Sequence, residues 1–80
     1  MKIHVRYFAS LREKLGEGGN IDLPENSTIG DLKQHLCQGS TTHMLLNESV
    51  LSALNFETAD DKTYLQNNDE VAFFPPVTGG

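Results

Sequence analysis

The last residues of the chain combine types that suit chemistry on a terminal carboxylate. The sequence closes with "FFPPVTGG", in which Pro75 and Pro76 precede Gly79 and Gly80. Proline fixes φ near about −65°, so the chain would leave a preceding strand in an extended, semi-rigid direction. Glycine has no Cβ, so Gly79 can pass through a narrow channel and Gly80 leaves its carboxylate sterically open. The residues that would make this passage are Val77, Thr78 and Gly79. We therefore expect chemistry on Gly80 inside another protein's active site; the alternative is an ordinary frayed end.

A pair of aromatic residues flanks the start of this tail. In "EVAFFP", Val71 and Phe73 alternate with Phe74, and Phe8 ends the outward face of the alternating run "MKIHVRYF". If Val71 and Phe73 face the core, Phe74 and Phe8 form a small exposed apolar patch, a common mark of a docking site. The alternative is that one of the two rings belongs to the core, because a one-residue shift inverts a strand's faces. Arg12 follows on the next element and can supply a polar rim. The predicted docking residues are Phe8, Arg12, Phe74, Pro75 and Pro76.

The other residues with chemical potential give weaker signals. Cys37 is the only cysteine, and its place in an apolar helix favours a buried structural thiol over a reactive one. His4, His35 and His43 have no companion at metal-ligand spacing, so no metal site is predicted. The "GEGG" stretch at 16–19 lacks the Gly-Lys-Ser/Thr ending of a phosphate-binding loop.

The first half of the chain predicts two strands around a short helix. The alternation in "MKIHVRYF" predicts a half-buried strand. "SLREKLG" predicts one to two helical turns, with Ser10 and Glu13 as a capping box and Gly16 at the C-cap. "NIDLPE" predicts a strand over 19–23 that pairs antiparallel with the first.

The second half predicts the main helix and two more strands. "STIGDLKQHLCQG" predicts a helix with a capping box of Thr28 and Asp31, a core-facing stripe, and an end at Gly39. The segment 40–49 is compatible with a helical turn or with irregular packing. The remaining expectations are a strand over 50–55, a polar turn in "ETADDKT", a tiny strand or 3₁₀ turn in "TYL", a turn in "QNNDE" and a last strand in "EVAFFP". This order predicts a single α+β domain with its main helix across one face of a sheet.

Composition narrows the classes of partner and location. The net charge is −5 with only six Lys and Arg, which disfavours nucleic acid. The acidity suits docking to a basic protein surface; the alternative is a solvated acidic surface that serves solubility. No apolar run approaches the roughly 20 residues of a membrane span. The single cysteine and the lack of a signal-peptide pattern favour the cytoplasm.

Several stretches resemble one known family. "DEVAFFPPVTGG" resembles the C-terminus of the MoaD family, the small subunit of molybdopterin synthase. "VRYFASLREKLG", "STIGDLKQHL" and "YLQNNDEVAFFPP" resemble that family's first strand and short helix, helix entry, and last turn and strand. The likeness covers most of the chain. One departure is Thr58, where family members carry a large apolar residue in a partner contact.

This resemblance implies a β-grasp, ubiquitin-like domain over 1–76 and a flexible tail over 77–80. It implies that a MoeB-like E1 enzyme adenylates Gly80 with ATP, and that a sulfur donor of the desulfurase or rhodanese type makes a thiocarboxylate. The loaded tail would then give sulfur to cyclic pyranopterin monophosphate in a MoaE-like large subunit, forming the molybdopterin dithiolene. The chain itself would bind no cofactor, and the active site would belong to the large subunit of a heterotetramer.

Two other functions share the same activation step and stay open. The ThiS family of thiazole synthesis has the same fold and diglycine end. A ubiquitin-like modifier would instead be attached through Gly80 to lysines. A stand-alone enzyme is not expected, because the sequence offers no convergent nucleophile and base.

Overall fold

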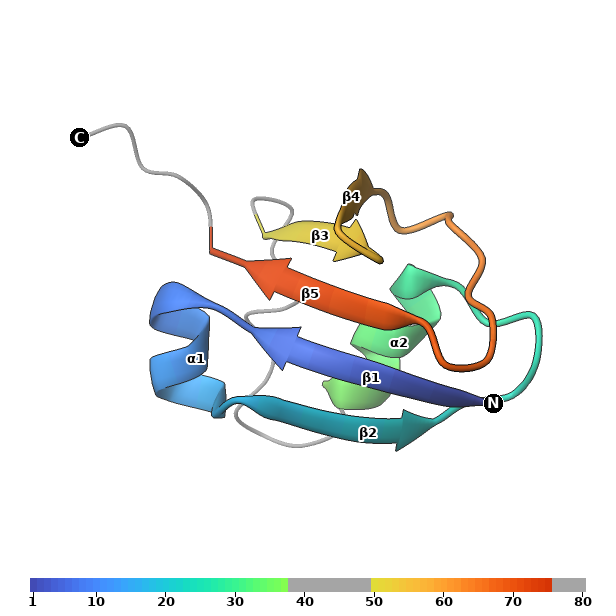
Figure 1. Ribbon diagram of the computed structural model, residues 1–80, viewed down its shortest axis with the longest axis horizontal. Coiled ribbons are helices and arrows are strands. Elements are labelled where there is room, and N and C mark those ends of the chain that lie inside the picture. The colour runs from blue at the N-terminus through green and yellow to red at the C-terminus, as the bar shows by residue number, and fades with distance from the viewer. Residues whose placement is uncertain (38–49, 76–80) are drawn as a thin grey trace.

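The computed structural model describes residues 1–37 and 50–75. This part of the chain forms five strands and two helices, arranged as in Figure 1. In chain order they are β1 (Lys2–Tyr7), α1 (Ala9–Leu15), β2 (Gly18–Asp22), α2 (Ile29–Leu36), β3 (Leu51–Leu54), β4 (Glu57–Ala59) and β5 (Glu70–Phe74). The expectations for Gly39, for His43, for 40–49 and for the tail over 76–80 lie outside the described residues.

The strands form one mixed sheet in the order β2-β1-β5-β3-β4. The first and last strands, β1 and β5, lie side by side at its centre and are parallel, whereas the other pairs are antiparallel (Figure 1). The predicted strands over 19–23 and 50–55 are confirmed within one residue at each end. A mixed sheet of this kind with one main helix is the expected β-grasp, α+β arrangement.

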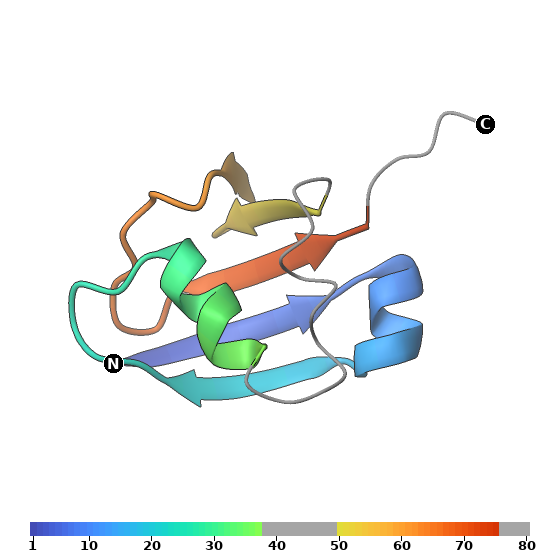
Figure 2. The same cartoon turned by 180° about the vertical axis from the view of Figure 1, so that it is seen from behind.

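The core lies between α2 and one face of the sheet. Figure 2 shows α2 crossing that face, while the opposite face, seen in Figure 1, carries no helix among the described elements. Alternate residues of β1 and β5 point toward the helix, which buries Ile3, Val71 and Phe73 completely. Ile29 and Leu32 of α2 meet them with no exposed surface of their own. The helix stripe predicted from the sequence is therefore the core-facing one.

The start of α2 follows the predicted capping box. The Thr28 hydroxyl accepts a hydrogen bond from the Asp31 N–H at 3.2 Å, and the Asp31 carboxylate accepts one from the Thr28 N–H at 2.9 Å. Lys33 on the same helix is buried, and its ammonium lies 2.7 Å from the Asp61 carboxylate. This ion pair joins the helix to the loop after β4.

The capping box predicted for the first helix is wrong. Phe8, not Ser10, is the N-cap residue of α1, and no side chain caps it. The helix begins directly after β1 because Phe8 is still held by the sheet, where its N–H donates to the Phe73 carbonyl at 3.1 Å. The sharp change of direction puts Ala9 at φ 54°, and Ser10 falls inside the first turn. Gly16 is at the C-cap as predicted, with φ 91°.

The stretch predicted as a polar turn after β3 contains a short strand. Glu57–Ala59 pairs antiparallel with β3 as the edge strand β4, and a hairpin turn at Asn55 and Phe56 joins the two strands. The predicted polar turn is present after β4, at Asp61 and Lys62. A three-residue polar edge strand has no hydrophobic alternation to reveal it. The turn expected in "QNNDE" is present, with Asn68 at φ 70°. Tyr64 forms a single bridge with Thr28, consistent with the tiny strand considered for that segment.

Candidate functional site

Phe8 and Phe74 form a stacked pair on the open face of the sheet. Their ring centroids are 4.8 Å apart and the ring planes differ by 12°. The parallel register of β1 and β5 produces this contact, because it pairs Tyr7 with Phe73 one residue earlier. Tyr7 and Phe73 stack on the core side at 6.0 Å, so the two aromatic pairs occupy opposite faces of the sheet. Both outer rings stay half-buried.

Leu51 extends this apolar surface across a third strand. It pairs with Phe74 in the antiparallel register of β3 and β5 and is 48% exposed. We call Phe8, Phe74 and Leu51 the aromatic patch. Sequence reasoning missed Leu51, because the partner of a strand residue depends on register and the run "VLSALNF" carries no clear alternation. An exposed apolar row beside the start of the tail is suited to protein contact.

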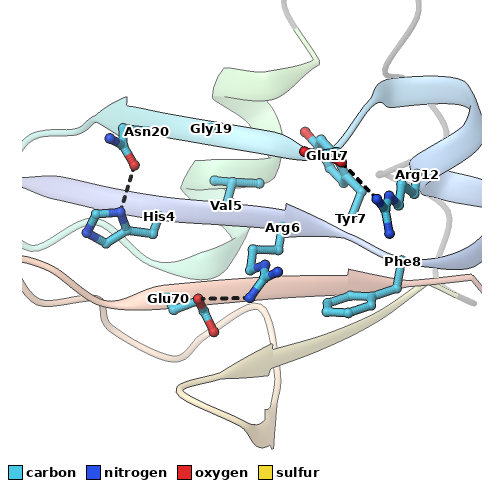
Figure 3. A pocket seen from close by; sticks show the side chains of 10 residues that line it. All are labelled: His4, Val5, Arg6, Tyr7, Phe8, Arg12, Glu17, Gly19, Asn20 and Glu70. Atoms are coloured by element: carbon cyan, nitrogen blue, oxygen red, sulfur yellow. Dashed lines mark hydrogen bonds and ion pairs between the residues drawn. The ribbon is translucent and has the colours of Figure 1, made fainter.

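Arginine borders the aromatic patch on the β1 side. The Arg6 guanidinium carbon lies 5.8 Å from the Phe8 ring centroid, within the range of a cation–π contact. Its guanidinium is also 3.8 Å from the Glu70 carboxylate (Figure 3). Arg6 was not predicted as a site residue. The sequence could have indicated Arg6, because residues two apart on a strand share a face and Arg6 stands two residues before Phe8.

Arg12 lines the same groove as Phe8 and is paired with a glutamate. Figure 3 shows it reaching toward Glu17, and its guanidinium is 2.8 Å from that carboxylate. Arg6, Phe8, Arg12 and Glu17 line an open groove of about 370 Å³. Arg12 and Phe8 thus line the same groove, and the role of Arg12 as a polar rim stays a prediction. The border is mixed in sign, because each arginine is accompanied by a glutamate.

The tail is described only at its beginning. Pro75 follows Phe74 and is half-buried. Pro76, Val77, Thr78, Gly79 and Gly80 lie outside the described residues, so their roles stay predictions.

The weaker candidates occupy ordinary structural positions. Cys37 is buried at the end of α2. Burial raises the pKa of the Tyr7 phenol, and the Cys37 thiolate adds to that rise. His4 Nδ1 lies 2.6 Å from the Asn20 side-chain oxygen, and His35 is exposed. Over 1–37 and 50–75, no group of three His, Cys, Asp or Glu side chains is placed to hold a metal ion.

Two further observations concern partners. Thr58, the departure noted in the sequence, lies exposed on β4. Neither helix of the described segments has the length and apolar content that crossing a bilayer requires.

Comparison with known proteins places the chain in a family. The model of the ThiS family matches residues 5–80. The chain belongs to the ThiS family. Among curated relatives, the molybdopterin synthase sulfur carrier subunit of Escherichia coli is 38% identical over 80 residues, covering 98% of this chain and 99% of the relative. The sulfur carrier subunit of Haemophilus influenzae is 36% identical with the same coverage of both chains.

Solved structures of similar fold come from two kinds of protein. SAMP1 of Haloferax volcanii superposes with a TM-score of 0.84 at 25% identity, covering all of both chains. A complex of subunits 1 and 2 of the molybdopterin-converting factor from Helicobacter pylori contains a chain that matches with a TM-score of 0.73 at 26% identity, again over both full lengths. This ThiS family member is therefore similar in fold both to a chain of a molybdopterin-converting factor complex and to a small archaeal modifier protein.

Proposed function

We propose that this chain is the sulfur carrier subunit of molybdopterin synthase. The observation that carries the proposal is its full-length similarity to curated sulfur carrier subunits, at 38% identity for the Escherichia coli protein. The proposed partner is a large subunit, in line with the two-subunit complex from Helicobacter pylori. A cytoplasmic location belongs to the same proposal.

The chemistry takes place on the carboxylate of Gly80. An E1-like enzyme joins that carboxylate to AMP from ATP and releases pyrophosphate, which gives the carbonyl a good leaving group. The persulfide of a sulfur donor then displaces AMP and forms an acyl disulfide with Gly80. A thiol reduces that disulfide, which leaves the thiocarboxylate on Gly80 and returns the donor as its free thiol. Its sulfur is a better nucleophile than a carboxylate oxygen, and the tail raises its effective concentration at the pterin acceptor. The carrier needs no acid, base or metal of its own.

The domain contributes a rigid platform for this tail. β5 pairs on both sides, with β1 and with β3, so the residue before Pro75 is fixed in the centre of the sheet. Phe74 of the aromatic patch is the last residue of β5, and Pro75 follows it directly. A partner that binds the patch therefore receives the tail in a defined direction. Arg6 and Arg12 supply cations at the edge of that contact.

A ubiquitin-like protein modifier is the second candidate. The superposition on SAMP1, named a small archaeal modifier protein, supports it. In that case Gly80 would form an amide with lysine amines instead of carrying sulfur. A sulfur carrier of thiazole synthesis is the third candidate, in line with the ThiS family match.

Intact-mass spectrometry of the protein purified from its own cells separates these functions. Exchange of one carboxylate oxygen for sulfur adds about 16 Da, which is expected for a carrier. Conjugates that link Gly80 to lysine without that mass gain would contradict the carrier function and support the modifier. Co-purification with a large molybdopterin synthase subunit, rather than with a thiazole synthase, then identifies the pathway. A chain lacking Gly80 is the control, because it should fold normally and never gain the mass.

A further inference from the structure

The turn between β3 and β4 holds a phenylalanine in an unfavourable backbone conformation. Asn55 and Phe56 connect the two strands, with φ of 49° and 72°. Positive φ at both central residues is the pattern of a type I′ hairpin turn, for which Asn followed by Gly is the preferred sequence. Asn55 fits this preference and Phe56 does not, because a bulky side chain at positive φ is strained.

Asn55 fixes this turn to the neighbouring strand. Its backbone N–H donates to the Glu70 carbonyl at 2.8 Å, and its side-chain oxygen accepts from the Glu70 N–H at 3.0 Å. Its side-chain amide also donates to the Asp69 carboxylate at 3.0 Å. The turn is thus held by two hydrogen bonds to the first residue of β5 and by one to Asp69 just before it, and Phe56 projects from a rigid base.

The Phe56 ring contributes little to the fold. It is 86% exposed, and among the residues that the structure describes the other exposed large hydrophobic side chains are Tyr64 at 67% and Leu51 at 48%. A glycine at this position would relieve the strain and lose almost no burial within the domain. A residue that strains the backbone and is left in water by its own chain indicates contact with another molecule.

The negative charges around the turn indicate what kind of surface a partner must present. Glu57 follows Phe56 directly and is exposed, and Asp69 accepts from Asn55 beside the turn. A second copy of this chain would bring like charges together, since the net charge is −5. A complementary surface is an apolar pocket bordered by Lys or Arg.

The distance along the sheet allows one partner to reach both Phe56 and the aromatic patch. Leu51 belongs to the patch and begins β3, and Phe56 follows the end of that strand. The three residue steps along β3, from Leu51 to Leu54, span about 10 Å. A standard interface covers about 800 Å² per partner, which corresponds to a disc roughly 16 Å in radius. A protein docked on the aromatic patch at this size extends to the hairpin.

We propose that Phe56 is a second docking anchor, which inserts into an apolar pocket with a basic border on the large subunit that receives the tail. This inference rests on the proposed function, because that function supplies the large subunit. The aromatic patch orients the tail at one end of β5, and Phe56 fixes the rotation of the carrier at the other.

Phe56→Gly tests the proposal, because stability and binding should change in opposite directions. The variant should melt about 5 °C higher, as expected when strain of this kind is relieved in a domain of this size. Its dissociation constant for the purified large subunit, measured by calorimetry with the full chain, should rise about 10-fold or more. Tyr64→Ser is the matched control, an exposed aromatic whose loss should change affinity less than 2-fold. Glu57→Gln should weaken binding at low salt and reduce its salt dependence.

The outcomes are distinguishable from failure of the proposed function. If the unmodified chain does not bind the large subunit, the proposed function is wrong. If it binds and Phe56→Gly binds within 2-fold of it, the anchor is wrong while the function stands. If sedimentation shows a dimer of this chain that Phe56→Gly converts to a monomer, the occupant is a second copy and the proposal is overturned.

Discussion

Gly18 is the position at which the smallest substitution should damage the domain most. It begins β2 opposite Arg6, with φ 108°. A Cβ built there would lie 2.0 Å from the Val5 carbonyl oxygen and 2.7 Å from its carbon. Both are backbone atoms of the central strand β1, so no side chain can rotate away. In Gly18→Ala, β2 must move off β1 at this end.

The magnitude follows from two separate effects. An alanine at this φ costs about 1–3 kcal/mol of backbone strain. Forcing extra volume into packed structure costs about 1–3 kcal/mol more. Together these effects predict a loss of about 2–6 kcal/mol, a large share of the roughly 5–15 kcal/mol by which domains are stable. Urea unfolding followed by circular dichroism measures it directly.

Two neighbouring glycines provide the controls. Gly16 has φ 91° but no atom within 4 Å of its Cβ position, so Gly16→Ala should show the strain alone, about 1–2 kcal/mol. Gly19 has the same open space, and Gly19→Ala should be stabilising by about 0.5–1 kcal/mol, because alanine suits a strand interior better. If the free energies of unfolding of Gly18→Ala and Gly19→Ala differed by less than about 1 kcal/mol, β2 would not approach β1 as closely as described.

Three further predictions concern the docking surface, the buried ion pair and alkaline pH. Phe74→Ala should weaken binding to the large subunit by about 2 kcal/mol or more. The loss in free energy of unfolding should be smaller, because the ring is only half-buried, and unchanged affinity in calorimetry would show that the patch is not the docking site. Asp61→Asn should lower the free energy of unfolding by about 1–2 kcal/mol, because it leaves the buried Lys33 ammonium without its carboxylate, while the 61% exposure of Asp61 limits the loss. Lys33→Met should lower the free energy of unfolding by less, and a larger loss for Lys33→Met than for Asp61→Asn in urea unfolding would refute this. The raised pKa of Tyr7 means that the fold favours the neutral phenol, so the free energy of unfolding should stay constant below the ordinary tyrosine pKa of about 10 and fall above it. Tyr7→Phe should remove that fall, and the same dependence of stability on alkaline pH in both proteins would contradict the prediction.

Sequence-based prediction succeeded for the elements whose local hydrogen bonds are compatible with the tertiary contacts around them. Thr28 and Asp31 cap α2 as expected because both donors and acceptors lie within one turn of the chain. The same pattern at Ser10 failed, because the sheet holds Phe8 and forces the helix to begin immediately after it. In this case a tertiary hydrogen bond outweighed a local propensity.

The candidate site was predictable where it depends on alternation and not where it depends on register. Phe8 and Phe74 face outward because their neighbours Tyr7 and Phe73 are core residues. The contribution of Leu51 requires the pairing of β3 with β5, which no local pattern encodes. Phe56 was missed because its turn departs from the Asn-Gly sequence by which such hairpins are recognised.

The parallel pairing of β1 with β5 has a consequence for how the chain matures. Val5 and Val71 are neighbours in the middle of the sheet, although nearly the whole sequence separates them. Contacts between such distant segments make folding slow, and here they delay closure of the core until translation has reached the final strand. An incomplete nascent chain therefore has no finished platform from which to offer a carboxyl group to the activating enzyme that we propose. Premature termination before β5 should yield a product for proteolysis rather than a defective carrier that competes for its partners.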